Sequence, residues 1–203
     1  MRISKELNLV VPVEVGDDTF YVHSSPIRSE VFKQYFLVLS KTLNALYAEG
    51  ISQVTGPRVA ALMLQDIAKE GDPEEIPSGW LGNSKSWSGK HGVENGLMAE
   101  IRRLSNVIMP TPDGWKNIPI GDALKQGLLT EQEVQEVEGF IVFFTCVWHI
   151  HKRNEVSTFL AHLGKVWDTQ TTSSSCTEFR DSLPRSTETE TFAPTVKQSL
   201  VPG

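Results

Sequence analysis

Thr130-Glu131-Gln132-Glu133 opens the most clearly marked helix of this sequence, and the run from Phe140 to Trp148 places that helix at the centre of the expected fold. A threonine followed three residues later by a glutamate is a capping box, in which the two side chains satisfy the first free amides of a helix. The run from Phe140 to Trp148 is apolar on nearly all sides, as in a helix that is buried within a core. We therefore expect a helix that begins after Thr130 and forms the central core element.

Helical spacing recurs on both sides of this segment. Apolar residues at steps of three and four predict a long helix from Val31 to Leu46 and a second helix from Arg58 to Lys69. Further helices are expected over Val93 to Val107, Gly121 to Gln126 and Asn154 to Lys165. The chain is therefore expected to be mainly helical.

Two pairs of short stretches carry strand signals. Leu9–Val15 and Thr19–Val22 flank a Gly-Asp-Asp turn and are rich in β-branched and aromatic residues, which predicts an N-terminal hairpin. Pro12 has no amide hydrogen and would place the first strand at an edge of its sheet. The same signals predict a second small hairpin that pairs Val107–Met109 with Trp115–Ile118. We expect an α+β fold that is predominantly helical, with the N-terminal β-hairpin packed on a helical bundle.

Composition divides the chain into two parts. Residues 1–168 contain the predicted elements, whereas residues 169–203 are rich in serine and threonine and have only scattered large apolar side chains. Such a segment buries too little apolar surface to fold alone. We therefore expect one helical domain over 1–168 and an extended, low-complexity C-terminal arm over 169–203. That arm is either disordered or ordered on the surface of a partner.

The charge and the apolar runs exclude several classes of partner. The 203 residues include 19 Lys and Arg against 25 Asp and Glu, which gives a net charge of −6. Surfaces that bind nucleic acids or anionic membranes need clustered positive charge, so we expect no nucleic-acid partner. The longest apolar run, Phe140 to Val147, is far shorter than the ~20 residues of a membrane span, and the N-terminus lacks the apolar core of a signal peptide. We expect a soluble protein with no membrane partner.

The candidate chemical groups do not have the spacing of a known catalytic or metal site. His149 and His151 would project from different sides of a helix, and no third ligand stands at a typical spacing. Cys146 lies among aromatic residues, where burial raises the pKa of a thiol. We therefore expect no enzyme activity, no metal and no cofactor. A metal-dependent or cysteine enzyme centred on Cys146, His149 and His151 remains as an alternative.

The best candidates for a functional surface are apolar. The helix from Val31 to Leu46 is either plain core or, where its aromatic residues are uncovered, a face that binds a partner or a second copy. The loop from Asp72 to Gly92 contains two tryptophans, and loops of this length are often functional. The candidate partner-binding residues are Phe32, Tyr35, Phe36, Leu39, Leu43, Trp80 and Trp87.

Four segments carry a resemblance to a known family. They are Phe20–Phe32, Gly56–Leu62, Glu100–Leu104 and Trp167–Thr172, and the similarity extends over most of the chain. In these segments the chain resembles the tail assembly chaperones of long-tailed bacteriophages. The resemblance implies a helical protein that binds the tape-measure protein, self-associates around it and is absent from the finished particle. It also implies an action in the host cytoplasm, with the tail-tube protein as a further partner that the arm recruits.

A structural protein of the phage tail or connector is the alternative to a chaperone. Such a protein would remain in the virion tail, where the arm over 169–203 would wrap a neighbouring subunit. An arm of this kind loses conformational entropy when it becomes ordered on its partner, and it gains an extended contact in return. The two hypotheses differ in whether mature particles contain the chain.

Overall fold

The computed structural model describes residues 7–48, 50, 55–70, 92–151, 156, 160, 164 and 167–184. The strands are β1 (Asn8–Val15), β2 (Asp18–Ser24), β3 (Ser105–Thr111), β4 (Gly114–Pro119) and β5 (Gln170–Thr172). The helices are α1 (Ser29–Gln34), α2 (Phe36–Ala48), α3 (Gly56–Glu70), the π-helix η3 (Val93–Met98), α5 (Ala99–Arg103), α6 (Ile120–Lys125), α7 (Glu131–Ile150) and α9 (Cys176–Ser182). The mixed α+β class is therefore confirmed.

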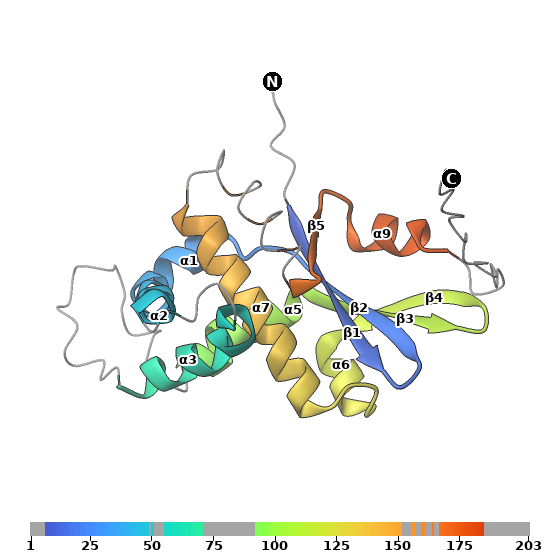
Figure 1. Ribbon diagram of the computed structural model, residues 1–203, viewed down its shortest axis with the longest axis horizontal. Coiled ribbons are helices and arrows are strands. Elements are labelled where there is room, and N and C mark those ends of the chain that lie inside the picture. Colours follow the sequence, from blue (N-terminus) through green and yellow to red (C-terminus); the bar gives the residue numbers. More distant parts are fainter. Residues whose placement is uncertain are drawn as a thin grey trace, which may run out of the picture.

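The five strands form one antiparallel sheet in the order β4-β3-β2-β1-β5 (Figure 1). Both predicted hairpins are present, as β1–β2 and β3–β4. The N-terminal hairpin is the middle of this larger sheet rather than a separate unit. The expectation that β1 is an edge strand is wrong, because β5 pairs with it at Asn8, Leu9 and Val10. Pro12 lies beyond these three residues, in a part of β1 that β5 leaves unpaired.

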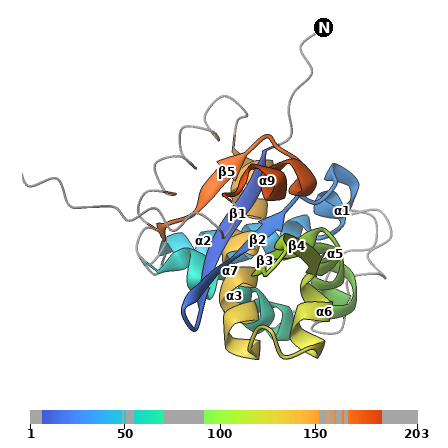
Figure 2. The ribbon, with the colours of Figure 1, turned by 90° about the vertical axis from the view of Figure 1, so that its right-hand side faces the viewer.

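The two faces of the sheet have different covers. Val11, Val22 and Val107 are register partners on the inner face and belong to the main core, together with the buried side chains of α2, α3 and α7. The outer face is covered by α9 (Figure 2). It carries a second, smaller cluster that contains Phe179 of α9. The alternation of strand side chains thus separates a large core under the helices from a small one under α9.

The central helix α7 is confirmed with its predicted cap. Thr130 accepts a hydrogen bond from the Glu133 amide, and the Glu133 carboxylate accepts one from the Thr130 amide. The middle of α7 is buried on nearly all sides. At Gly139 the helix touches the start of α3, where a Cβ would lie 2.4 Å from the Pro57 carbonyl oxygen and 2.6 Å from that of Arg58. The absence of a side chain at Gly139 therefore sets how closely the two helices pack.

Two predicted helices have different bounds from those expected. The helix over 31–46 is interrupted at Tyr35 and becomes α1 and α2. The helix over 93–107 starts as the π-helix η3 and ends at Arg103, because Ser105 and Val107 pair with β2 in the sheet. Of the helix expected over 154–165, residues 156, 160 and 164 are described, and they are helical.

The first part of the expected C-terminal arm belongs to the fold, which corrects the division at residue 168. Leu9 and Val10 of β1 pair with Thr171 and Gln170 of β5, and Phe179 of α9 is buried on the sheet. A second capping box, between Ser175 and Glu178, starts α9. Residues 185–203 lie outside the described part of the chain.

The hydroxyl of Thr145 provides a test of the α7 packing. It is buried and has no hydrogen-bond partner among the described residues, whereas the buried Thr42 hydroxyl donates to the Val38 carbonyl oxygen at 2.8 Å. Because an unsatisfied buried hydroxyl costs about 1 kcal/mol or more, Thr145→Val is expected to raise the melting temperature by about 2–4 °C. The matched variant Thr42→Val should lower it. A thermal melt of both variants decides this, and a destabilised Thr145→Val would show that the hydroxyl is satisfied.

Candidate partner-binding surface

The structure separates the candidate residues into three groups. Four are buried in the chain's own core, namely Phe32, Tyr35, Leu39 and Leu43. As core residues they support the surface of α1 and α2 and do not form it. Phe36 has 43% of its surface exposed, whereas Trp80 and Trp87 lie outside the described residues. Among the candidates that are described, Phe36 is the one with a large apolar side chain at the surface.

The interruption at Tyr35 places Phe36 on the surface. Tyr35 leaves helical geometry, with φ −106° and ψ 12°, and its hydroxyl donates to the Gly92 carbonyl oxygen at 3.3 Å. Its ring lies against Gly96 of η3, where a Cβ would be only 1.8 Å from the tyrosine oxygen. Gly96 therefore makes room for Tyr35 in the core, and the chain resumes its helix at the exposed Phe36.

Ring contacts connect Phe36 to the C-terminal end of α7, which lies beside α1 (Figure 1). Phe36 meets Phe32 edge-on at a centroid distance of 5.8 Å, and Phe32 stacks on His149 at 4.4 Å. The Nε2 atom of His149 donates a hydrogen bond to the Ile27 carbonyl oxygen at 3.0 Å, since a carbonyl can only accept. Ile150, the next residue of α7, is 39% exposed. Phe36 is thus connected through Phe32 to His149, and the exposed Ile150 directly follows His149 at the end of α7.

A polar groove of about 550 Å³ opens at this stack. Its walls are the turn between β2 and α1, the junction of α5 with β3, and the end of α7. Arg28 and Arg103 line it, and Arg103 donates two hydrogen bonds to Glu100, at 2.6 and 2.8 Å. The hydrogen bond from Arg103 lowers the pKa of Glu100, and the positive charges of Arg103 and Arg28 lower it further. The other polar lining residues are Ser25, Ser29, Glu30, Trp148 and His149.

We call Phe36, Ile150 and this groove the groove surface. The groove joins two of the segments that carry the family resemblance, because residues 25–30 belong to Phe20–Phe32 and residues 103–104 to Glu100–Leu104. Exposed apolar anchors bordered by charged and hydroxyl groups are the usual composition of a surface that binds another protein reversibly.

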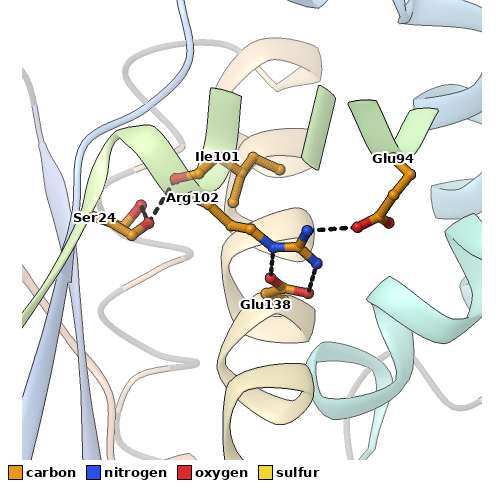
Figure 3. A network of polar contacts seen from close by, with 6 residues as sticks. Ser24, Glu94, Ile101, Arg102 and Glu138 are labelled. Atoms are coloured by element: carbon orange, nitrogen blue, oxygen red, sulfur yellow. Dashed lines mark hydrogen bonds and ion pairs between the residues drawn. The ribbon is translucent and has the colours of Figure 1, made fainter. Parts of the chain in front are cut away.

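A buried ion pair fixes the wall that carries Arg103 (Figure 3). Arg102, its neighbour on α5, forms a bidentate pair with Glu138 of α7 and a second ion pair with Glu94 of η3 at 2.5 Å. The Glu138 side chain is only 4% exposed. Burial raises the pKa of Glu138, and the hydrogen bonds and positive charge of Arg102 oppose this rise.

A serine pair joins the same wall to the sheet (Figure 3). The buried Ser105 hydroxyl donates to the Ile101 carbonyl oxygen at 2.8 Å and lies 2.9 Å from the Ser24 hydroxyl. The end of α5 is therefore held by α7 on one side and by β2 on the other.

Cys146, the candidate nucleophile of the enzyme alternative, lies inside the core. Its thiol is fully buried, and burial raises the pKa of Cys146 to about 12. The sulfur contacts the Leu39 carbonyl oxygen at 3.6 Å rather than a histidine. Among the described residues no three His, Cys, Asp or Glu side chains are grouped to hold a metal ion. No described helix is long and apolar enough to cross a membrane.

Sequence reasoning missed Ile150, Arg28 and Arg103 as members of the surface. The groove is built from three segments, and each contributes one wall. Because these segments are far apart in the chain, no spacing rule connects them. The signal that was available was the resemblance itself, because two of its segments meet here.

Comparisons of the chain with protein-family models, with curated proteins and with solved structures return no match.

Proposed function

We propose that this chain is a tail assembly chaperone of the kind found in long-tailed bacteriophages, and that it binds an apolar segment of the tape-measure protein through the groove surface. The observation that supports this most directly is the exposed Phe36, whose ring contacts lead through Phe32 to His149 in the wall of a polar groove. The resemblance of the four segments supplies the family.

The chemistry of the surface suits a partner helix with an apolar stripe and polar flanks. Burying a fully exposed phenylalanine side chain contributes about 1.5–3 kcal/mol. Because 43% of Phe36 is exposed, its burial contributes about 1 kcal/mol, a factor of about 5 in affinity. Arg28 lines the groove and offers a positive charge to a carboxylate at the edge of that stripe, whereas Arg103 already pairs with Glu100. Such a surface shields a partner's apolar residues until tube subunits replace it, and it needs no catalytic step.

The proposal includes the remaining partners of the family. Self-association around the tape-measure protein, recruitment of the tail-tube protein and action in the host cytoplasm belong to it. In the alternative, a structural tail protein retained in the virion, the arm wraps a neighbouring subunit. Since Gln170–Thr172 and Cys176–Ser182 are used within this chain's own fold, that role is left to residues 185–203.

Co-purification of the full chain with the tape-measure protein encoded near it tests the proposal, together with mass spectrometry of mature particles. We expect a complex with the tape-measure protein and no copies of the chain in purified particles. Many copies in particles, without binding to the tape-measure protein, would establish the structural tail protein instead.

A further inference from the structure

The outer face of the sheet carries a half-buried apolar patch that α9 leaves partly uncovered. We call it the outer patch and define it as Pro12, Tyr21, Pro110 and Trp115. Pro12 pairs with Tyr21 and Pro110 pairs with Trp115 across the sheet, and the Tyr21 and Trp115 rings lie 5.8 Å apart. These four side chains therefore form one continuous surface on neighbouring strands.

The chain leaves α9 at this patch. The indole nitrogen of Trp115 donates a hydrogen bond to the Pro184 carbonyl oxygen at 2.7 Å, and Leu183 packs on the outer cluster. Arg180 of α9 also donates to the Asn117 side-chain oxygen of β4 at 2.9 Å. Arg180 and Pro184 thus both contact β4, and Pro184 is the last described residue.

Residues 185–203 contain four large apolar side chains, Phe192, Val196, Leu200 and Val201, and two acidic residues balanced by two basic ones. From Pro184 an extended chain reaches about 26 Å by Phe192, at ~3.3 Å per residue. The patch spans from β4 to β1, which is about 14 Å at ~4.8 Å between strands. The first large apolar residue after Pro184 can therefore reach every part of the patch.

We propose that the outer patch is the docking site for this chain's own residues 185–203, with Phe192 as the anchoring side chain. A segment tethered at Trp115 has an effective concentration in the millimolar range, so it competes well with the same segment of a second copy. Tyr21 and Trp115 offer an aromatic surface to the phenyl ring. The net charge of residues 185–203 is zero, so net charge repulsion does not oppose docking.

Paramagnetic relaxation in the full-length chain tests this docking. A nitroxide is attached at Ala193→Cys in a Cys176→Ser background, since Cys146 is buried and unreactive. We expect the backbone amides of Tyr21 and Trp115, and the indole N–H of Trp115, to lose most of their intensity, while the amide of Ala68 in α3, on the other side of the sheet, keeps its own. Adding Phe192→Ser should restore the lost signals, whereas Val201→Ser, a matched change farther along the segment, should not.

The alternatives give different results. For the second-copy alternative, an isotope-labelled chain without a nitroxide is mixed with an unlabelled chain that carries one. Broadening of Tyr21 and Trp115 in the labelled chain would mean that a second copy occupies the patch, and it would overturn the proposal. Full intensity at Tyr21 and Trp115, or broadening that Phe192→Ser does not relieve, would overturn it as well. A well-dispersed spectrum of the Cys176→Ser background confirms that the reporter chain is folded.

Discussion

Replacing Gly139 by alanine is expected to destabilise the protein by about 3 kcal/mol, which lowers the melting temperature by about 6–12 °C. The new Cβ would lie 2.4 Å from the Pro57 carbonyl oxygen and 2.6 Å from the Arg58 carbonyl oxygen. Both are backbone atoms at the start of α3 and cannot rotate away, so the helix itself must move outward. The better helix propensity of alanine, about 1 kcal/mol, does not offset this.

Gly121→Ala is the matched control for Gly139→Ala. Gly121 lies in α6, and nothing is within 4 Å of its ideal Cβ position. Alanine at this position is expected to be neutral or to stabilise by about 0.5 kcal/mol. Thermal melts of both variants give the comparison. Equal melting temperatures would show that α3 does not pack on α7 at Gly139.

Removing the guanidinium of Arg102 is expected to lower the free energy of unfolding by a similar amount. In Arg102→Met the Glu138 carboxylate loses its bidentate partner while its side chain is only 4% exposed. Breaking a buried ion pair in this way costs about 3 kcal/mol, the lower end of the usual range, because Arg102 is itself 36% exposed. The double variant Arg102→Met/Glu138→Leu should recover much of the loss, since no buried charge remains.

The pH dependence of the stability of Arg102→Met distinguishes two causes of the loss, the unpaired charge of Glu138 and the lost packing of the Arg102 side chain. Burial raises the pKa of Glu138, and in the variant no arginine opposes that effect. A raised pKa in the folded state favours protonation there, so the variant should regain stability as the pH falls through the folded pKa of Glu138 towards its ordinary value. The difference in unfolding free energy between Arg102→Met and the double variant should therefore shrink from pH 7 to pH 5. A constant difference would assign the loss to packing.

The sequence was most informative where one segment determines its own structure. The helix α7 was predictable because its cap and its apolar run are both local, and both hairpins follow from local turns. The interruption at Tyr35 was not predictable, because it depends on Gly96 of η3, far along the chain. The strand β5 is three residues long, and pairing with β1 is what orders it. The capping box at Ser175 was a local signal for α9 within the Ser/Thr-rich composition.

The candidate site was predictable only in part for the same reason. An apolar helical stripe does not say which of its residues face the core, and the interruption at Tyr35 decides that Phe36 faces outward while Leu39 and Leu43 face inward. The groove needs three segments that only the tertiary fold brings together.

Binding of the tape-measure protein to Phe36→Asp and Tyr47→Asp variants tests the central claim most directly. Both side chains are 43% exposed and both lie on α2, about 16 Å apart along the helix axis. We expect Phe36→Asp to weaken binding at least about 10-fold with an unchanged melting temperature, and Tyr47→Asp to leave binding as it is. Equal affinities of Phe36→Asp and the wild-type chain would contradict the claim that the groove surface holds the partner.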